Sequence, residues 1–309
     1  MINMLDKYYG CLLGLAIGDA LGAPIEFSTP GTFTSITDYI DGGYYGLKKG
    51  QWTDDTSVAL CLGESLIKCQ GFNAKDQMDT YCLWYTQGHL SSTGTCFDIG
   101  NTMRKALCDY QQNKNPFAGS TNAFTAGNGS LMRIAPVPMF FKEPTTIVHM
   151  AALSSKTTHA ASEAVDACRY YAYLIKLALD GATKDQILAP LSSLPDREPI
   201  TSKIIKIAAG AYKTKMPPDI QGTGYVIQSL EAALWSFYRT TSFKEAVLTA
   251  VNLGDDADTT GAICGQLAGA YYGYAAIPEH WIKDLCKNSF IKTIAKRLYQ
   301  SKNTREVES

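Results

Sequence analysis

Apolar residues recur along much of the chain at steps of three and four, the spacing of one buried face of an α-helix. One such stripe runs from Val58 to Cys69 and a second from Val165 to Leu179. Shorter patterns predict further helices over residues 76–87, 98–112, 145–154, 184–190, 201–212, 225–238, 243–253, 259–275 and 279–301. No convincing series of alternating apolar and polar positions indicates a β-sheet. The pattern therefore predicts an all-α protein.

Four loops interrupt this pattern, and each contains Gly or Pro: residues 41–50, 113–129, 190–200 and 215–224. None has the composition of a flexible linker between domains. With 309 residues, of which 46% are hydrophobic and 18% charged, the chain can bury a sizeable core. We therefore expect residues 1–309 to form one compact helical domain.

The charge balance argues against two classes of partner. A formal net charge of −1 gives no general attraction to nucleic acid or to an anionic membrane surface. The longest uncharged stretch, Thr259 to Pro278, is long enough to cross a membrane, but it is rich in glycine and contains Gln266. A buried helix is the better interpretation of this stretch.

The cysteines favour a reducing compartment. The nine cysteines include no CxxC pair, and several lie on apolar helical stripes. Free thiols are therefore expected rather than a disulfide framework or a zinc site. The first residues, "MINMLDKYYG", lack the charged and apolar regions of a signal peptide. These features predict a cytoplasmic location.

Two segments carry glycine at every fourth position, which on a helix gives a stripe without side chains. The positions are Gly10, Gly14, Gly18 and Gly22 in one segment, and Gly261, Gly265, Gly269 and Gly273 in the other. Each glycine costs the helix about 1 kcal/mol relative to alanine, and close helix–helix approach would compensate. Tight packing alone explains the stripes. A compatible interpretation is that the packing also brings Asp19 towards Asp256 and Asp258.

Acidic residues gather in two short segments, "WTDDT" at 52–56 and "GDDADTT" at 254–260, each just ahead of a helical pattern. Asp and Thr are favoured helix caps, so capping is the alternative explanation. A helix dipole contributes only about 0.3–1 kcal/mol per charge, too little to offset several desolvated carboxylates. A divalent cation would offset them. The absence of His and Cys points to Mg²⁺ or Mn²⁺ rather than zinc, and two clusters could hold two ions.

Six segments of the sequence resemble the motifs of a known family. "GCLLGLAIGDALGAPIEF", "WTDDTSVAL", "TGTCFDIGNT", "GNGSLMRIAPV", "THAASEAV" and "GDDADTTGAICGQLAGAYYG" occur in this order between residues 10 and 273. Together they resemble the ADP-ribosylglycohydrolase family, and "SSTGTCFDIGNT" resembles its arginine-directed bacterial branch. The resemblance implies an all-α fold around a binuclear Mg²⁺ or Mn²⁺ centre. It also implies cleavage of the glycosidic bond between C1″ of ADP-ribose and a modified side chain.

The resemblance also implies which residues hold the two cations. The implied ligands are Thr53, Asp54, Asp55, Asp256, Asp258 and Thr259. Asp255 stands where many family members carry glycine, so we leave it out of this set, and it could instead cap the following helix. Hydrolysis at an anomeric carbon passes through an oxocarbenium-like state, and bound cations can activate a water molecule as the nucleophile.

The implied catalytic residues are Glu26, Asp55 and Asp98. Glu26 matches a family glutamate near the metals, as an acid, a base or a water-positioning residue. Without the resemblance, Glu26 would be interpreted as a surface residue after a turn. Asp98 matches an acid of the arginine-directed branch, whereas by its position alone it would be a helix N-cap.

The substrate-binding residues rest largely on the resemblance. "GNGS" at 127–130 is a glycine-rich turn that could cradle phosphate, although its spacing alone is a weak signal. The resemblance places Asn128, Gly129 and Ser130 near the diphosphate and ribose. It also suggests that His159 contacts ADP-ribose and that Tyr225 stacks on adenine. A histidine cap or core residue and a core aromatic residue are the respective alternatives.

These residues lead to a functional prediction. We expect a metal-dependent hydrolase that removes mono-ADP-ribose from arginine of a modified protein and releases ADP-ribose. Cleavage from serine, a nucleobase or a small metabolite is one alternative, and a catalytically silent ADP-ribose-binding protein is another. A serine-type catalytic triad is the weakest alternative, since the chain has no GxSxG segment. We expect a monomer.

Overall fold

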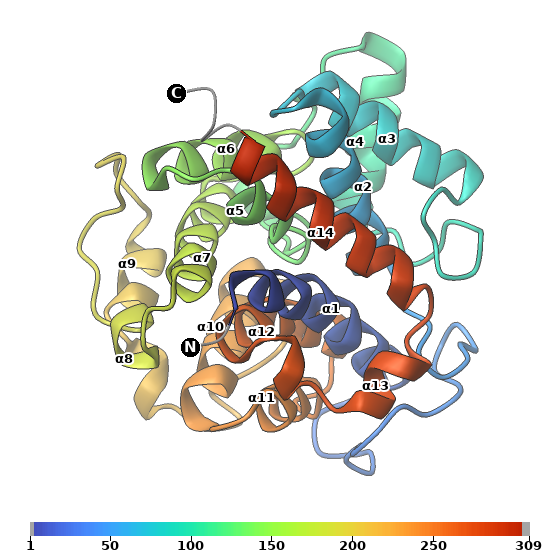
Figure 1. Ribbon diagram of the computed structural model, residues 1–309, viewed down its shortest axis with the longest axis vertical. Coiled ribbons are helices and arrows are strands. Elements are labelled where there is room, and N and C mark those ends of the chain that lie inside the picture. The colour runs from blue at the N-terminus through green and yellow to red at the C-terminus, as the bar shows by residue number, and fades with distance from the viewer. Residues whose placement is uncertain (1–2, 305–309) are drawn as a thin grey trace.

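The computed structural model describes residues 3–304, and within them it contains helices and three isolated bridges but no β-strand (Figure 1). The prediction of an all-α fold is confirmed. The α-helices are α1 Met4–Gly22, α2 Asp54–Cys69, α3 Ala74–Gln87, α4 Asn101–Asn113, α5 Pro136–Phe140, α6 Pro144–Lys156, α7 Ser162–Asp180, α8 Lys184–Ile187, α9 Ser202–Ala208, α10 Val226–Arg239, α11 Phe243–Val251, α12 Ala257–Tyr272, α13 Glu279–Asp284 and α14 Asn288–Thr304.

Most helices lie where the apolar spacing predicts them, and the differences have local causes. The predicted helix 279–301 is two helices, α13 and α14, because the chain turns at Lys287, whose φ is +53°. The predicted helix 201–212 ends early, since Gly210 has a φ of +86°. The short proline-containing helix α5 was not predicted, because its five residues are too few to show a helical period.

Helices α1 and α12 pack antiparallel with their backbones in contact, in the middle of the molecule (Figure 1). A Cβ atom added to Gly14 would lie 2.3 Å from the carbonyl oxygen of Gly265, and one added to Gly269 would lie 1.9 Å from that of Gly10. No side chain fits between the two glycine stripes. The close approach predicted from the stripes is therefore observed.

This packing sets the end of one helix beside the start of the other. The contact runs from Gly10 against Gly269 to Gly22 against Ala257, so the C-terminal end of α1 meets the N-terminal end of α12. Asp19 and Asp258, which lie at these two ends, are both fully buried. The glycine contact thus determines where the acidic residues meet.

The remaining helices enclose this pair. Helices α7, α10 and α11 pack against α12, and α2 and α14 pack against α1. The buried apolar side chains form one continuous cluster. Residues Met4–Ile25 are long and apolar enough to cross a membrane, but most of this segment is buried inside the fold. The uncharged stretch after Thr259 is mostly the buried helix α12, as expected.

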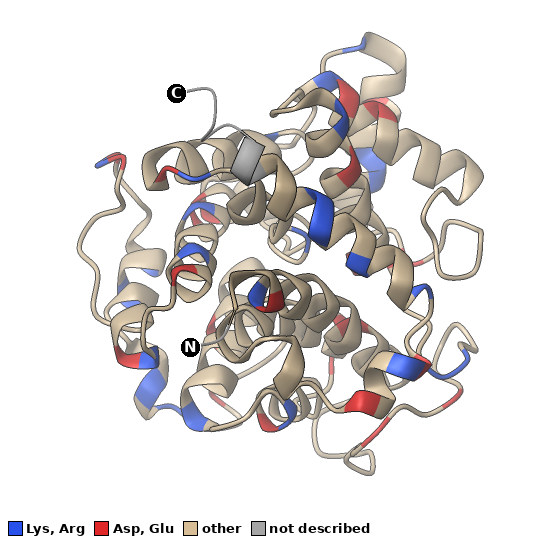
Figure 2. Ribbon diagram, viewed as in Figure 1, with Lys and Arg blue, Asp and Glu red and all other residues tan. Residues whose placement is uncertain are grey.

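The structure also shows how the charged residues are distributed and in which state the cysteines are. Figure 2 shows basic and acidic residues interspersed along the helices, without a continuous basic face in this view. All nine cysteines are free. Burial raises the pKa of Cys11 well above that of an ordinary thiol and that of Cys264 to about 12. These two thiols therefore stay protonated at neutral pH.

Candidate active site

A single carboxylate, Asp19 on α1, holds the start of α2. One of its oxygens accepts hydrogen bonds from the Thr53 backbone N–H at 2.8 Å and from the Thr53 hydroxyl at 3.0 Å. The other accepts from the Thr56 backbone N–H at 3.0 Å and from the Thr56 hydroxyl at 2.6 Å. Asp19 therefore places the "WTDDT" segment at the end of the α1–α12 pair.

The two acidic segments meet in space through two threonine hydroxyls. Thr53 Oγ1 lies 3.1 Å from Asp258 Oδ2 and 3.3 Å from Asp55 Oδ2. Thr259 Oγ1 lies 3.3 Å from the same oxygen of Asp55. Four of the six implied cation ligands are thus connected to one another. The structure brings together segments that are about 200 residues apart in the chain.

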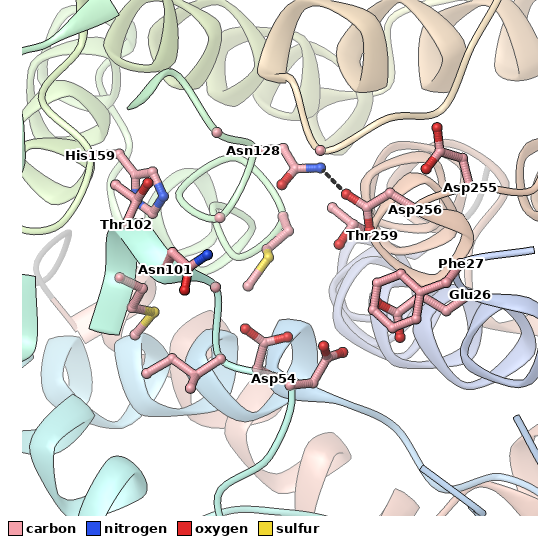
Figure 3. A pocket seen from close by; sticks show the side chains of 18 of the residues that line it. Glu26, Phe27, Asp54, Asn101, Thr102, Asn128, His159, Asp255, Asp256 and Thr259 are labelled. Carbon is pink, nitrogen blue, oxygen red and sulfur yellow. Dashed lines mark hydrogen bonds between the residues drawn. The ribbon is translucent and has the colours of Figure 1, made fainter. Parts of the chain in front are cut away.

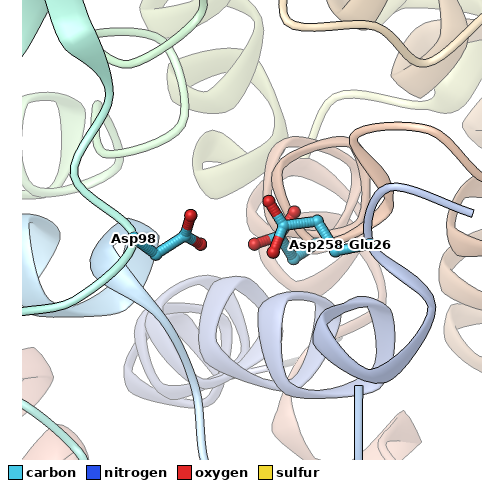
Figure 4. Close-up of side chains that lie close together, drawn as sticks. All are labelled: Glu26, Asp98 and Asp258. Carbon is cyan, nitrogen blue, oxygen red and sulfur yellow. The ribbon is translucent and has the colours of Figure 1, made fainter. Parts of the chain in front are cut away.

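Two further carboxylates, those of Glu26 and Asp98, converge on Asp258 of this cluster. Oxygens of Glu26, Asp98 and Asp258 all lie within 4.8 Å of one another (Figure 4). Glu26 follows the 3-10 turn at the end of α1 and is buried, so it is not a surface residue. Asp98 lies on the loop before α4 with a φ of +59°, and Tyr45 donates a hydrogen bond of 2.7 Å to it.

Helix capping does not account for these acids. The N-cap of α4 is Gly100, so Asp98 does not cap that helix. The N-caps of α2 and α12 are Thr53 and Asp256, and neither side chain makes a capping hydrogen bond. Asp256 instead accepts a hydrogen bond from Asn128 Nδ2 at 2.7 Å. Asp255 does not cap α12 either, since its backbone turns with a φ of +57° and pairs with Phe27 and Ser28.

Burial and mutual repulsion raise the pKa values of the whole cluster. Burial, followed by the charges of Asp98 and Asp256, raises the pKa of Glu26 to about 10. Burial raises the pKa of Asp98 to about 7. The same cause raises the pKa values of Asp54, Asp55 and Asp258 well above the ordinary value. These carboxyls cannot all be ionised together without a positive charge nearby.

The donor set fits a hard divalent cation. Asp55 Oδ1 and Glu26 Oε2 are buried and have no hydrogen-bond partner among the described residues. Carboxylate and hydroxyl oxygens are the ligands that Mg²⁺ and Mn²⁺ prefer. A cation here would supply the missing partners and lower the raised pKa values.

The carboxylates form one wall of a cavity of about 480 Å³ (Figure 3). We call Glu26, Asp54, Asp55, Asp98, Asp256 and Asp258 the acidic wall. Four of these six line the cavity directly, whereas Asp55 and Asp258 lie fully buried beneath it. We call Asn128, Gly129, Ser130 and His159 the turn wall, and all of these except Ser130 line the cavity. A second cavity of about 550 Å³ adjoins the first and shares Thr102, Gly127 and Gly224 with it.

The predicted substrate-binding residues take different positions. Asn128, Gly129 and His159 line the first cavity. The Ser130 hydroxyl lies behind the turn, where it accepts a hydrogen bond of 2.8 Å from Ser155, so only its backbone remains for a ligand. Tyr225 lines the second cavity rather than the first, and its hydroxyl contacts Lys203 and Glu163.

Several cavity residues had no signal in the sequence. Phe27 and Tyr45 line the first cavity but lie on loops, where no periodicity reports which side chain faces inward. Phe27 has a φ of +62°, and its N–H donates to the carbonyl oxygen of Asp255 at 2.7 Å. Asp19 was expected near the site but not as the residue that organises it.

Comparison with known proteins gives the class of this protein. The sequence model of the ADP-ribosylglycohydrolase family matches residues 1–308. The chain therefore belongs to the ADP-ribosylglycohydrolase family, as its motifs predicted, and it is a glycohydrolase. A solved structure titled "ADP-ribosylglycohydrolase-related protein complex" is similar to it, with a TM-score of 0.86 and 40% identity over 97% of this chain and 99% of that one.

Two kinds of named relative are similar over most of their length. The ADP-ribosylarginine hydrolase Tri1 of Serratia proteamaculans is 39% identical over 96% of this chain and 79% of its own. Its counterpart in Pseudomonas putida is 40% identical over 96% of this chain and 78% of its own. The ADP-ribosyl-[dinitrogen reductase] glycohydrolase of Rhodospirillum rubrum is 30% identical over 91% and 90% of the two chains.

Proposed function

We propose that the protein removes mono-ADP-ribose from arginine side chains of modified proteins by hydrolysing the C1″ N-glycosidic bond, with two Mg²⁺ or Mn²⁺ ions as cofactors. The observation that carries the proposal is the convergence of Glu26, Asp98 and Asp258 within 4.8 Å at the wall of a cavity. The relatives of about 40% identity that are named ADP-ribosylarginine hydrolases support the choice of substrate.

The proposed ligands of the two cations are Thr53, Asp54, Asp55, Asp256, Asp258 and Thr259. Bound there, the cations would supply positive charge, orient the ribose hydroxyls and lower the pKa of a water molecule. Asn128 orients the Asp256 carboxylate through its hydrogen bond, and Asp19 fixes Thr53. The protein residues thus set the position and direction of the donor atoms before any ion binds.

Proton transfer falls to Glu26 and Asp98, with Asp55 beneath them. Glu26 Oε2 has no partner among the described residues, so it can hold or accept a proton from a water molecule. Asp98 is held by Tyr45 at the wall of the cavity, and we assign it to the leaving group. Its pKa of about 7 in the absence of a cation suits exchange of a proton near neutral pH.

The shape of the site suits ADP-ribose on one side and arginine on the other. The two adjoining cavities extend from the acidic wall past Gly127 to Tyr225, which gives room for the diphosphate and adenosine. On the opposite side, Phe27 is 58% exposed and lies next to Glu26. Phe27 contacts Tyr44, and Tyr44 contacts Tyr45. Aromatic rings beside carboxylates favour a guanidinium over a neutral serine.

The proposal is tested with two chemically defined substrates. Purified protein is incubated with Mg²⁺ or Mn²⁺ and a peptide that carries ADP-ribose on arginine, and in parallel with a peptide that carries it on serine. We expect cleavage of the arginine linkage and none with EDTA. Cleavage of serine-linked ADP-ribose alone would favour the serine alternative. If neither peptide is cleaved, a nucleobase and a small metabolite that carry ADP-ribose are assayed next, and release from one of these alone would favour that acceptor. ADP-ribose binding that survives EDTA without turnover would indicate a silent binding protein.

We also propose that the enzyme acts as a monomer in the cytoplasm. The nine free thiols support a reducing compartment. Light scattering coupled to gel filtration tests the oligomeric state, and a stable dimer would contradict the proposal.

A further inference from the structure

Arg133 is a fully buried cation behind the turn wall, and within the described residues it forms no ion pair. Its Nη1 donates to the carbonyl oxygen of Gly129 at 3.0 Å, and its guanidinium lies 4.7 Å from the ring centre of Tyr81. Its Nε has no hydrogen-bond partner there. Burial of an unpaired charge is costly, so the fold keeps this guanidinium at a cost that its local contacts do not explain.

The hydroxyl of Thr158 connects the Arg133 guanidinium to a residue of the cavity. Arg133 Nη2 donates to Thr158 Oγ1 at 2.7 Å, and the same oxygen lies 2.8 Å from His159 Nδ1. Thr158 is fully buried, and no other side-chain contact of its hydroxyl is present in the described residues. The three residues therefore form a linear chain that ends at the imidazole of His159.

The donors in this chain determine the tautomer of His159. A guanidinium can only donate, so Thr158 Oγ1 accepts from Arg133, and its own hydrogen needs an acceptor. The ring nitrogen Nδ1 is the acceptor within reach. If Nδ1 carried the proton instead, a buried O–H would be left unpaired, which costs about 1–3 kcal/mol. Nδ1 is therefore unprotonated, and Nε2 carries the ring hydrogen.

The ring also stays neutral, because two effects oppose its protonation. Burial lowers the pKa of His159 to about 3, and the charge of Arg133 lowers it as well. At neutral pH the ring therefore has one hydrogen. The hydrogen-bond chain decides that this hydrogen is on Nε2.

The Nε2 edge of the ring faces the ligand cavity. His159 lines the cavity, and Nε2 has no partner among the described residues (Figure 3). A Cβ added to Gly129 would lie 2.9 Å from Cε1 of the ring and 3.1 Å from Nε2, so the glycine turn lies directly on this edge. The backbone N–H groups of Gly129 and Ser130, on the same turn, also lack an acceptor in the described chain. These unused donors are suited to an anion.

We infer that Arg133 and Thr158 are positioning residues that hold His159 as a neutral Nε2–H donor to the diphosphate of the bound ligand. The choice of diphosphate rests on the proposed function. The position of the ring hydrogen does not, because it follows from the ligand-free hydrogen bonds alone. Arg133 acts through Thr158 and through its field, without touching the ligand.

The tautomer is tested first, without any ligand. Protein labelled with ¹⁵N-histidine is examined by two-dimensional NMR at pH 7, and the His159 signals are assigned by their loss in His159→Gln. We expect an unprotonated Nδ1 and a protonated Nε2 in the wild type and in Thr158→Ser. In Thr158→Val, which lacks the hydroxyl, we expect a shift towards the other tautomer. A wild-type ring with its hydrogen on Nδ1, or a charged ring, would overturn the inference.

Ligand affinity is tested next, by calorimetry with ADP-ribose and Mn²⁺. We expect Thr158→Val to weaken binding about tenfold, which corresponds to about 1.4 kcal/mol, and Thr158→Ser to stay within about twofold of wild type. Because the diphosphate is remote from the reacting bond, KM should rise in Thr158→Val while kcat holds. Equal affinities of the two variants would overturn the inference, as would a parallel loss of kcat and melting temperature. A wild type that does not bind ADP-ribose would instead remove the proposed function, and the NMR result would still decide the tautomer.

Discussion

The two walls of the cavity are stabilised in opposite ways. Four of the six carboxylates of the acidic wall lie in the caps or first turns of α2 and α12. They gather at one end of the α1–α12 pair, whose backbones are in contact. Their positions are rigid, yet oxygens of Asp55 and Glu26 lack partners. The turn wall has no helix of its own, and side-chain hydrogen bonds from Arg133 and Thr158 hold it.

This contrast indicates what each wall needs from outside. The acidic wall is preorganised but electrostatically unfavourable without a positive charge nearby. The turn wall has no such excess of charge, and its unused N–H donors are suited to an anionic ligand. We therefore expect the stability of the protein to respond to metal and pH mainly through the acidic wall, and ligand affinity to respond mainly through the turn wall.

The largest expected effect is that of Asp258→Asn, which changes one oxygen of the acidic wall to a nitrogen at nearly constant shape. Loss of a carboxylate from a cation site should cost several kcal/mol, so kcat/KM with Mn²⁺ should fall by about 10³-fold or more. The chelated variant should melt higher than chelated wild type, because one buried like charge is gone. Activity assays and thermal melts measure both.

Asp255→Asn is the matched control for this change. Asp255 is the neighbouring acid outside the acidic wall, and asparagine tolerates its φ of +57°. We expect kcat/KM within a few-fold of wild type. Comparable losses in the two variants would remove the distinction between the three aspartates of this segment.

The next effect is the dependence of metal stabilisation on pH. Burial raises the pKa of Asp19 to about 6 and that of Asp98 to about 7, above the ordinary value of 3.8. A raised folded-state pKa means that stability is fully present below pH 4 and is lost as the pH rises through the folded values. The chelated protein should therefore lose stability between about pH 4 and pH 7 through these groups. His159 acts in the opposite direction, but equally with and without metal.

A cation replaces the protons, so the melting-temperature difference between Mn²⁺-loaded and EDTA-treated protein should increase with pH. At a free concentration of 100 times Kd, one ion adds about 2.7 kcal/mol to the free energy of unfolding. Differential scanning fluorimetry from pH 5 to pH 8 measures the difference. A difference that is constant or decreases with pH would contradict the assignment of the acidic wall as the cation site.

A third test addresses the helix pair that carries the acidic wall. A Cβ on Gly265 would lie 2.0 Å from the backbone oxygen of Gly14, so Gly265→Ala must separate α1 from α12. We expect the free energy of unfolding to fall by about 1–3 kcal/mol or more, and the melting temperature to fall with it. Gly100→Ala is the control, because a Cβ there meets nothing within 4 Å. Equal melting temperatures would show that the helix pair can relax.

The smallest effect is expected at the far end of the ligand cavity. Tyr225→Phe keeps the ring but removes the hydroxyl that contacts Lys203 and Glu163. The Lys203–Glu163 pair is partly exposed and worth under about 1 kcal/mol, so ADP-ribose affinity should change less than about fivefold. Tyr225→Ala removes the ring and should weaken binding more. If both variants bind alike in calorimetry, Tyr225 does not stack on the ligand.

The helices of this structure can be predicted from the sequence, whereas its loops can be predicted much less well. Helix positions follow from periodic apolar residues, and the α1–α12 contact follows from two glycine stripes, because both signals repeat many times. A single residue such as Lys287, whose positive φ divides the last predicted helix, gives no such repeat.

The site shows the same division. The acids before α2 and α12 are recognisable because charges crowd within a few residues. Glu26 and Asp98 needed the family resemblance, since each alone fits an ordinary surface or capping position. Tyr45 and Thr158 give no signal at all, because their roles depend on which side chain a loop turns inward and on partners far away in the chain.

The contact between α1 and α12 has a consequence during synthesis on the ribosome. Helix α1 is made first, but its partner begins only at Ala257, near the other end of the chain. Until then the apolar residues Met4–Ile25, which are long enough to enter a membrane, have no glycine stripe to cover them. Until α12 is made, the apolar residues of α1 must therefore be covered by other contacts. The acidic wall cannot form early, because a chain that stops before α12 lacks Asp258.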